Sequence, residues 1–394
     1  MPTAEWNEGR SKIPTNCSPY WRSISGCVSR PAPASARELI CHGPRDRGSV
    51  IGAGRELARG IGSRLDRDVN PLKAATLALL ATLTLVLPSV FAAESKAKGK
   101  AAAKAAEPAA YAASVPKPTF AEVRYGAHER HVLDFWKAES TAPAPLVFVI
   151  HGGGWQGGEK ERVDRFVDVA ALLKAGISVA AINYRLIRHA EADGVVPPVK
   201  APLHDAARAL QFVRSKAREW NLDRTRVGAT GGSAGACSSL WLAFHDDLAD
   251  PRSTDPVARE STRLFCAAVN GAQTTLDPLQ MKEWTPNSRY GGHAFGVGAF
   301  PQFLAAREKI LPWINEYSPY ALVSAGDPPI YLFYNTPPAL GQDQKDPTHT
   351  SNFGVKLQER CAAAGVACEL VYPGAPGVKH DNATAYLIAK LKAR

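Results

Sequence analysis

An α/β fold built on a largely parallel sheet is the architecture that the sequence predicts for residues 116–394. Short apolar runs of strand length alternate along this part of the chain with longer segments of helical periodicity, which is the pattern of parallel strands joined by helices. The run at 145–150 reads Pro-Leu-Val-Phe-Val-Ile, and a continuous apolar strand is typical of a sheet covered on both faces. The segment of about 280 residues is long enough to bury one large core.

The expected elements follow one another in a regular order, without a visible internal repeat. The expected strands are 121–125, 131–136, 145–150, 177–183, 226–230, 265–270, 329–334 and 367–371. The expected helices include 162–175, 202–220 and 234–245. Helix 202–220 is amphipathic, because Leu203, Leu210 and Val213 recur at helical spacing, so one of its faces should pack on the sheet.

A long insertion at 272–327 separates two of these strands and is too long for a simple connection. Insertions of this kind often form a cap over a functional site. The insertion is rich in aromatic residues, namely Trp284, Tyr290, Phe295, Phe300, Phe303 and Trp313. The sequence leaves open whether these rings line a pocket or form a small core of the insertion itself.

The first 115 residues differ in composition from the rest of the chain. Residues 1–68 are rich in Arg, Ser, Gly and Pro and lack sustained periodicity, so we expect a disordered or untranslated leader. Residues 94–115 form an Ala/Lys-rich linker. Residues 1–115 hold 16 Lys+Arg and 9 Asp+Glu, whereas residues 116–394 hold 31 and 28. Because the basic excess belongs mainly to the leader, we expect no nucleic-acid partner for the folded domain.

A secretory signal peptide is expected at 69–93. Lys73 precedes an apolar run at 74–87, and the small residues around Val90 and Ala92 provide an A-x-A-like end. A membrane anchor is the alternative, since 74–93 approaches the length of a membrane span, but Pro88 and the many Ala and Thr residues disfavour it. Because a signal peptide stands at a chain's start, we hypothesise that translation begins at Val69. The protein is then secreted or periplasmic, without a stable membrane partner.

Four cysteines lie in the expected domain, at positions 237, 266, 361 and 368. The sequence has no C-x-x-C pair, so a zinc or redox site is not expected. Cys361 and Cys368 flank an expected helix-to-strand turn and could form a disulfide in an oxidising compartment. Two buried free thiols are the alternative.

The segment Gly231-Gly232-Ser233-Ala234-Gly235 matches G-x-S-x-G and lies between an expected strand and an expected helix. An abrupt strand-to-helix turn lifts the serine hydroxyl clear of the sheet, and small neighbours are needed because side chains at Gly231 or Gly235 would crowd the turn. The following helix N-terminus favours developing negative charge. This pattern in this context predicts Ser233 as a nucleophile.

A second glycine motif, His151-Gly152-Gly153-Gly154-Trp155, directly follows the buried strand 145–150. Glycines let backbone N–H groups approach a substrate closely, and an acyl-transfer site needs donors where an oxyanion forms. We therefore predict that Gly153 and Gly154, with the N–H of Ala234, form an oxyanion hole. A tight glycine turn is the alternative for the motif taken alone.

With these two motifs in this order, the chain resembles the α/β-hydrolase superfamily, in its lipase/esterase (carboxylesterase) branch with an HGGGW oxyanion motif. The resemblance extends from about Phe120 to the C-terminus, and it includes Asn183-Tyr184-Arg185 and Asp205. The chain departs from the usual pattern at Gly232, where such esterases often carry an acidic residue, and at Ala236, where they often carry glycine.

The resemblance implies a catalytic triad in the order serine, acid, histidine. It points to His380, which lies in a proline-glycine loop after the last expected strand, as the base. It points to Asp346 as the acid, with Asp343 as a competitor in the same loop. His349 is close to Asp346 in the sequence and is the second candidate for the base.

The implied activity is that of a serine esterase that forms an acyl-enzyme and needs no metal or organic cofactor. Its substrate would be a small-molecule or polysaccharide-linked ester, such as an acetyl or feruloyl ester of plant polysaccharide. A peptidase or arylformamidase on the same fold is an alternative. Two further alternatives are not enzymes. One is a non-catalytic binding protein with this fold, and the other is an anchored protein whose function lies in the basic leader.

The expected signal peptide predicts a mature N-terminus near Ala93 or Glu94, because Val90 and Ala92 supply the small residues of a cleavage site. Mass spectrometry of the protein isolated from its host should find peptides only from beyond this point. Recovery of peptides from residues 1–60 would contradict both the signal peptide and the start at Val69.

Overall fold

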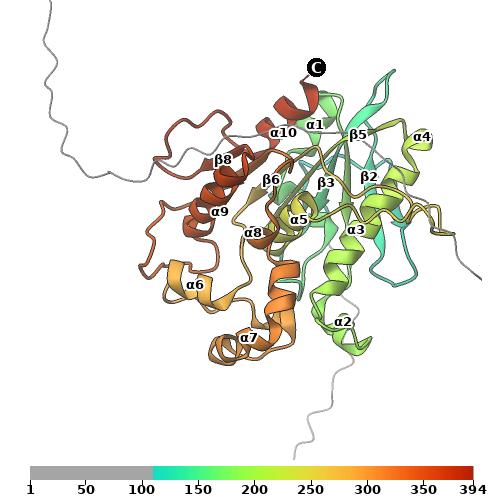
Figure 1. Cartoon of the computed structure of the whole chain (residues 1–394). Helices are drawn as coiled ribbons and strands as arrows, with labels where there is room; N and C mark the ends of the chain where they lie inside the picture. Colours follow the sequence, from blue (N-terminus) through green and yellow to red (C-terminus); the bar gives the residue numbers. More distant parts are fainter. Residues whose placement is uncertain (1–109, 394) are drawn as a thin grey trace, which may run out of the picture. The chain divides into compact units, whose positions relative to one another are not determined.

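The computed structural model describes residues 110–393 (Figure 1). The expected leader at 1–68, the signal peptide at 69–93 and most of the linker at 94–115 lie outside the described residues. Among the helices of the described part, none is both long enough and apolar enough to cross a membrane.

The core of the structure is an eight-stranded, mostly parallel sheet, which confirms the predicted fold class (Figure 1). Its strands lie in the order β1-β2-β4-β3-β5-β6-β7-β8. Only the pairs β1–β2 and β2–β4 are antiparallel. The strands are β1 (Phe120–Arg124), β2 (Val132–Trp136), β3 (Ala144–Ile150), β4 (Ser178–Ile182), β5 (Leu222–Gly232), β6 (Cys266–Asn270), β7 (Ile330–Phe333) and β8 (Cys368–Val371).

Helices cover both faces of this sheet, which explains why its central strands are apolar throughout. Along β3, Phe148 and Ile150 belong to one hydrophobic cluster and Val147 and Val149 to the other, because successive side chains of a strand point to opposite faces. Helices α3 (Lys200–Ser215), α5 (Ala234–Phe244) and α9 (Ser351–Ala364) contribute to the first cluster. Helices α1 (Val169–Lys174) and α10 (Ala383–Lys392) contribute to the second.

Two expected helices are interrupted in the structure. The pattern at 162–175 corresponds to a 3₁₀ helix, η1 (Lys160–Arg165), followed by α1, which starts where the Asp168 carboxylate accepts a hydrogen bond from the N–H of Ala171. The pattern at 202–220 corresponds to α3 and a short α4 (Ala217–Trp220), which ends at Asn221 in left-handed backbone. One further short helix, α2 (Ile187–Ala192), was not expected from the sequence.

The insertion at 272–327 folds into helices whose aromatic side chains largely join the main core. The helices are α6 (Pro278–Trp284), η2 (Gly292–Phe295), α7 (Phe300–Tyr317) and α8 (Pro319–Leu322). Trp284, Phe295 and Phe303 are buried in the same cluster as the sheet. Of the two interpretations left open by the sequence, a role in packing therefore applies to these three rings.

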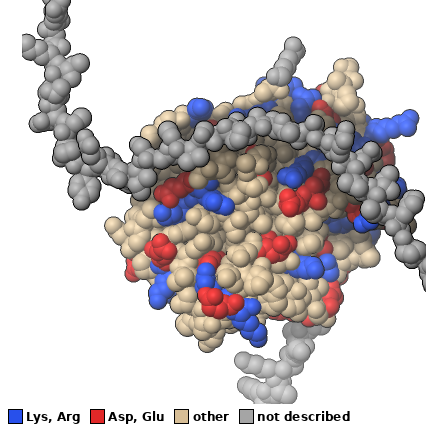
Figure 2. Space-filling view, viewed as in Figure 1, with Lys and Arg blue, Asp and Glu red and all other residues tan. Residues whose placement is uncertain are grey.

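Cys361 is buried at the end of α9 and Cys368 is half-buried at the start of β8, and both are free thiols in the structure. On the face of the molecule shown in Figure 2, basic and acidic side chains are interspersed, without one large patch of a single sign. The interspersion agrees with the near balance of charge in residues 116–394.

Candidate active site

Ser233 occupies a sharp turn between the end of β5 and the start of α5. Its backbone angles, φ 53° and ψ −121°, lie outside the regions that a residue with a side chain ordinarily adopts. A Cβ on Gly231 would lie 2.3 Å from the carbonyl oxygen of Ile150, and a Cβ on Gly235 would lie 2.1 Å from the same atom. The glycines of the predicted elbow are therefore required by the close approach of β3.

The second glycine motif lies directly beside this turn. A Cβ on Gly152 would meet the carbonyl oxygen of Gly232 at 2.5 Å and the Cβ of Ser233 at 3.5 Å. Gly153 and Gly154 follow with φ of +105° and +63°, values that favour glycine. Among residues 110–393, no group accepts a hydrogen bond from the backbone N–H of Gly153, Gly154 or Ala234. These three N–H groups thus have no hydrogen-bond acceptor within the described part of the chain.

A buried polar network fixes the start of this loop. The ring of His151 stacks on that of Tyr184 with centroids 4.2 Å apart, and the Tyr184 hydroxyl donates to the carbonyl of His151 at 2.7 Å. The guanidinium of Arg130 donates to the carbonyls of Gly158 and Tyr184. Burial lowers the pKa of His151 to about 3, so its imidazole is neutral near pH 7 and helps to shape the loop without adding charge.

The imidazole of His349 is hydrogen-bonded to the Ser233 hydroxyl. Its Nε2 lies 3.0 Å from Oγ of Ser233, and its Nδ1 lies 2.8 Å from Oδ2 of Asp346. The other oxygen of Asp346 accepts hydrogen bonds from the backbone N–H groups of Thr348 and His349. Burial alone would raise the pKa of Asp346, but the hydrogen bonds from His349 and the backbone outweigh it and hold that pKa below its usual value.

The structure pairs Ser233 with His349, the second candidate, and not with His380, which contradicts the prediction of His380 as the base. The Nδ1 of His380 lies 2.8 Å from a carboxylate oxygen of Glu369 in β8, and the other oxygen accepts the backbone N–H of His380. Its ring also packs edge-on against Tyr386 of α10. Glu369 and Tyr386 therefore hold the imidazole of His380 in a local structural role, and His349 takes the place beside the serine.

Asp346 lies where the sequence predicted it, whereas its competitor Asp343 makes no hydrogen bond to His349 among the described residues. The order of serine, aspartate and histidine along the chain is kept. However, Asp346 and His349 both belong to the loop between β7 and α9, and not to the loop after β8. The signal in the sequence was the spacing Asp-x-x-His, which can place both side chains on one turn.

Two cavities adjoin the Ser233–His349 hydrogen bond. One, of about 470 Å³, is lined by Ser233, Gly152, Gly153 and the η1 segment, and the other, of about 400 Å³, is lined by His349 and residues of η1 and α10. None of the six aromatic residues of the insertion named above lines either cavity. The two cavities are thus bordered by the glycine loop, η1 and the loop that follows β7.

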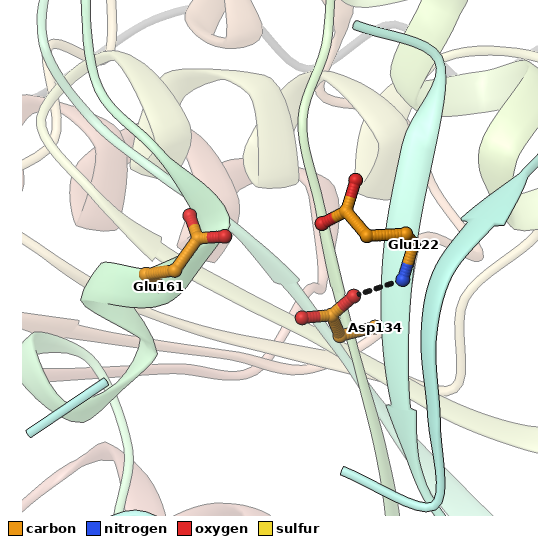
Figure 3. A group of neighbouring side chains, drawn as sticks. All are labelled: Glu122, Asp134 and Glu161. Atoms are coloured by element: carbon orange, nitrogen blue, oxygen red, sulfur yellow. Dashed lines mark hydrogen bonds between the residues drawn. The ribbon is translucent and has the colours of Figure 1, made fainter. Parts of the chain in front are cut away.

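Glu122, Asp134 and Glu161 are the one group of the described residues whose spacing would suit a metal ion (Figure 3). The ammonium group of Lys160, which is 2% exposed, is ion-paired with all three carboxylates. Asp134 also accepts a hydrogen bond from the backbone N–H of Glu122 at 2.7 Å (Figure 3). The lysine supplies the positive charge that a cation would bring, so the cluster joins β1, β2 and η1 and has no vacancy for a metal.

Comparison with known proteins identifies a family and a similar protein. The sequence model of the BD-FAE family matches residues 133–344. The chain is similar to the probable carboxylic ester hydrolase LipM of Mycobacterium tuberculosis, with 31% identity over 151 residues, which are 37% of this chain and 32% of LipM. The chain thus spans about a third of the length of this curated relative.

Solved structures are also similar to this chain. A truncated carbohydrate esterase from gut microbiota superposes with a TM-score of 0.50 at 20% identity, over 67% of this chain and 90% of that one. The acetyl ester-xyloside bifunctional hydrolase of Caldicellulosiruptor lactoaceticus gives a TM-score of 0.46 at 23% identity, over 61% and 77%.

Proposed function

Because the chain belongs to the BD-FAE family and has the α/β-hydrolase fold, we propose that it hydrolyses carboxylic esters with Ser233 as the nucleophile. The observation that carries this proposal is the continuous hydrogen-bonded chain Ser233–His349–Asp346, which ends at a strained turn beside three free backbone N–H groups.

In the proposed reaction, Ser233 Oγ attacks the ester carbonyl while Nε2 of His349 takes the hydroxyl proton. Asp346 accepts a hydrogen bond from Nδ1–H of His349, which leaves the lone pair on Nε2 directed at the serine. His349 then donates the proton to the departing alcohol, and a water molecule, activated by the same imidazole, hydrolyses the acyl-enzyme.

The negative charge of the tetrahedral intermediate would be bound by the N–H groups of Gly153, Gly154 and Ala234. Preorganised donors of this kind contribute about 3–4 kcal/mol each to the stability of the transition state. Ala234 is the first residue of α5, an 11-residue helix, so the helix dipole adds a favourable field at the same point.

Exposure of the site favours an ester carried on a large alcohol, such as an acetyl or feruloyl group on polysaccharide. The side chains of His349 and Asp346 are 40% and 59% exposed, so a bulky leaving group can approach the base without a lid having to open. A carbohydrate esterase shares the fold. An exported protein, as the segment at 69–93 predicts, would meet such polymers outside the cell.

The activity itself is tested with Ser233→Ala. We expect the purified protein to hydrolyse 4-nitrophenyl acetate and butyrate, and the variant to lose this activity by a factor of roughly 10⁴–10⁶, because only the nucleophile is removed. Unchanged thermal melting would show that the variant is folded. A wild-type protein that cleaves an aminoacyl-anilide or an N-formyl arylamine faster than any ester would replace the proposal by the amidase alternative.

The choice of base is tested with a matched pair of variants. His349→Gln should lower kcat by a factor of roughly 10⁴ or more, because Ser233 loses its proton acceptor. His380→Gln should leave kcat within a few-fold of wild type and change mainly the melting temperature, because that ring contacts Glu369 and Tyr386. Loss of activity in His380→Gln with activity retained in His349→Gln would refute the proposed triad.

The acid is tested in the same way with Asp346→Asn and Asp343→Asn. Asp346→Asn keeps the shape of the side chain but would favour the wrong tautomer of His349, so we expect a rate lower by about 10⁴. Asp343→Asn removes the same charge from the same loop and should have little effect. Steady-state kinetics of both variants on one soluble ester measure the difference, and equal rates would contradict the assignment of Asp346.

A further inference from the structure

Positive charge is concentrated on one side of the proposed nucleophile. The cavity that contains Ser233, called here the Ser233 cavity, has a volume of about 470 Å³ and is lined by Gly152, Gly153, Arg162, Arg165 and Phe166. Both arginines belong to η1, which directly follows the glycine loop.

These two arginines have no partner of opposite charge. Among residues 110–393, no side chain or carbonyl forms an ion pair or hydrogen bond with the guanidinium group of Arg162 or Arg165. The carboxylate that lines the same cavity, Glu159, already accepts hydrogen bonds from Arg130 at 3.2 Å and from Asn183 at 3.2 Å. The guanidinium groups of Arg162 and Arg165 are therefore free to bind an anionic group beside the proposed nucleophile.

Among residues 110–393, no neighbouring acidic residue forms an ion pair with either arginine. Glu161, adjacent to Arg162 in the sequence and drawn in Figure 3 with Glu122 and Asp134, forms an ion pair with Lys160. Asp164, Asp168 and Asp381 line the other cavity, which contains His349. Arg165 lines both cavities and so also borders these carboxylates, whereas Arg162 lines only the Ser233 cavity.

We propose that Arg162 and Arg165 bind a carboxylate of the ester substrate, so that the preferred substrates are anionic esters. The guanidinium group matches the planar, two-oxygen geometry of a carboxylate and stays charged at all relevant pH values. The volume of the Ser233 cavity greatly exceeds that of an acetyl group. The carboxylate can thus lie several ångströms from the ester carbon, either on a longer acyl chain or on a uronic acid sugar that carries the ester.

This inference rests on the proposed esterase function and deepens it. Positive charge near Ser233 would also stabilise the oxyanion of any ester, charged or neutral. The informative quantity is therefore the ratio of kcat/KM for a charged ester to that for a matched neutral ester, and not the rate on either one alone.

The experiment uses two matched substrate pairs and the full-length protein. Monoethyl glutarate and ethyl hexanoate differ by a carboxylate on the acyl group. Mono-O-acetyl methyl glucuronoside and mono-O-acetyl methyl glucoside differ by a carboxylate on the alcohol. We expect the wild-type protein to favour the charged member of one pair by about tenfold, and the pair concerned identifies which part of the substrate is recognised.

The double variant R162Q/R165Q should bring that ratio close to one. The control R218Q/R252Q removes the same charge at exposed positions that line neither cavity, and it should keep the wild-type ratio. Hydrolysis of the neutral esters by the wild-type protein reports on the proposed function separately. Absence of a charge preference in the wild-type protein, or a preference that survives in R162Q/R165Q, would overturn the inference.

If R162Q/R165Q fails to fold, the arginine site can still be tested by the salt dependence of the wild-type protein. Added salt should lower the wild-type kcat/KM for the charged ester several-fold and leave that for its neutral partner nearly unchanged, because exposed charges are screened. R162K/R165K, which keeps both charges, should retain part of the preference. Equal salt dependence of the two esters would also count against the arginine site.

Discussion

The close approach of the β3 and β5 backbones at their carboxyl ends is the constraint on which the site depends. Ile150 pairs with Gly231 across the two strands, and the Ile150 carbonyl leaves no room for a Cβ on either Gly231 or Gly235. This contact brings the glycine loop after β3 next to the turn at Ser233. The proposed nucleophile and the N–H groups of the proposed oxyanion hole, about eighty residues apart in the sequence, are thereby positioned by the sheet itself.

The stability of this arrangement depends on polar groups that the reaction does not use. The glycine loop is held by hydrogen bonds to backbone carbonyls from Arg130, Tyr184 and the neutral ring of His151. Lys160 anchors the following η1 segment to β1 and β2 through its ion pairs with the carboxylates of Glu122 and Asp134, and it also pairs with Glu161 of η1. These contacts hold the backbone of the segment from His151 to Lys160, which carries the glycine loop, whereas the side chains of Arg162 and Arg165 further along η1 are exposed.

The sequence predicted the sheet, the elbow and the glycine loop because each depends on local patterns: apolar runs, helical periodicity and closely spaced glycines. It also located Asp346, which precedes a proline in the expected loop. It failed for the histidine, because His349 and His380 both follow a strand and only tertiary contacts distinguish them. The ring of His380 is hydrogen-bonded to Glu369 and packs against Tyr386. No local pattern in the sequence reveals that Glu369 of β8 points at that ring.

Because Asp346 and His349 lie in one loop, the proposed catalysis requires only that loop to be held in position relative to Ser233. In a triad spread over two loops, each loop must be positioned separately, whereas here the geometry of the aspartate–histidine pair is set within a single turn. The only other requirement is that this turn be held in the right position relative to Ser233. It is fixed by Gln273, whose amide donates to the Thr348 carbonyl at 2.8 Å, and by Thr350, whose side chain caps α9. Gln273 lies at the start of the helical insertion, so this insertion acts on the proposed chemistry by holding the proposed base in place, although none of its six aromatic residues named above lines either cavity.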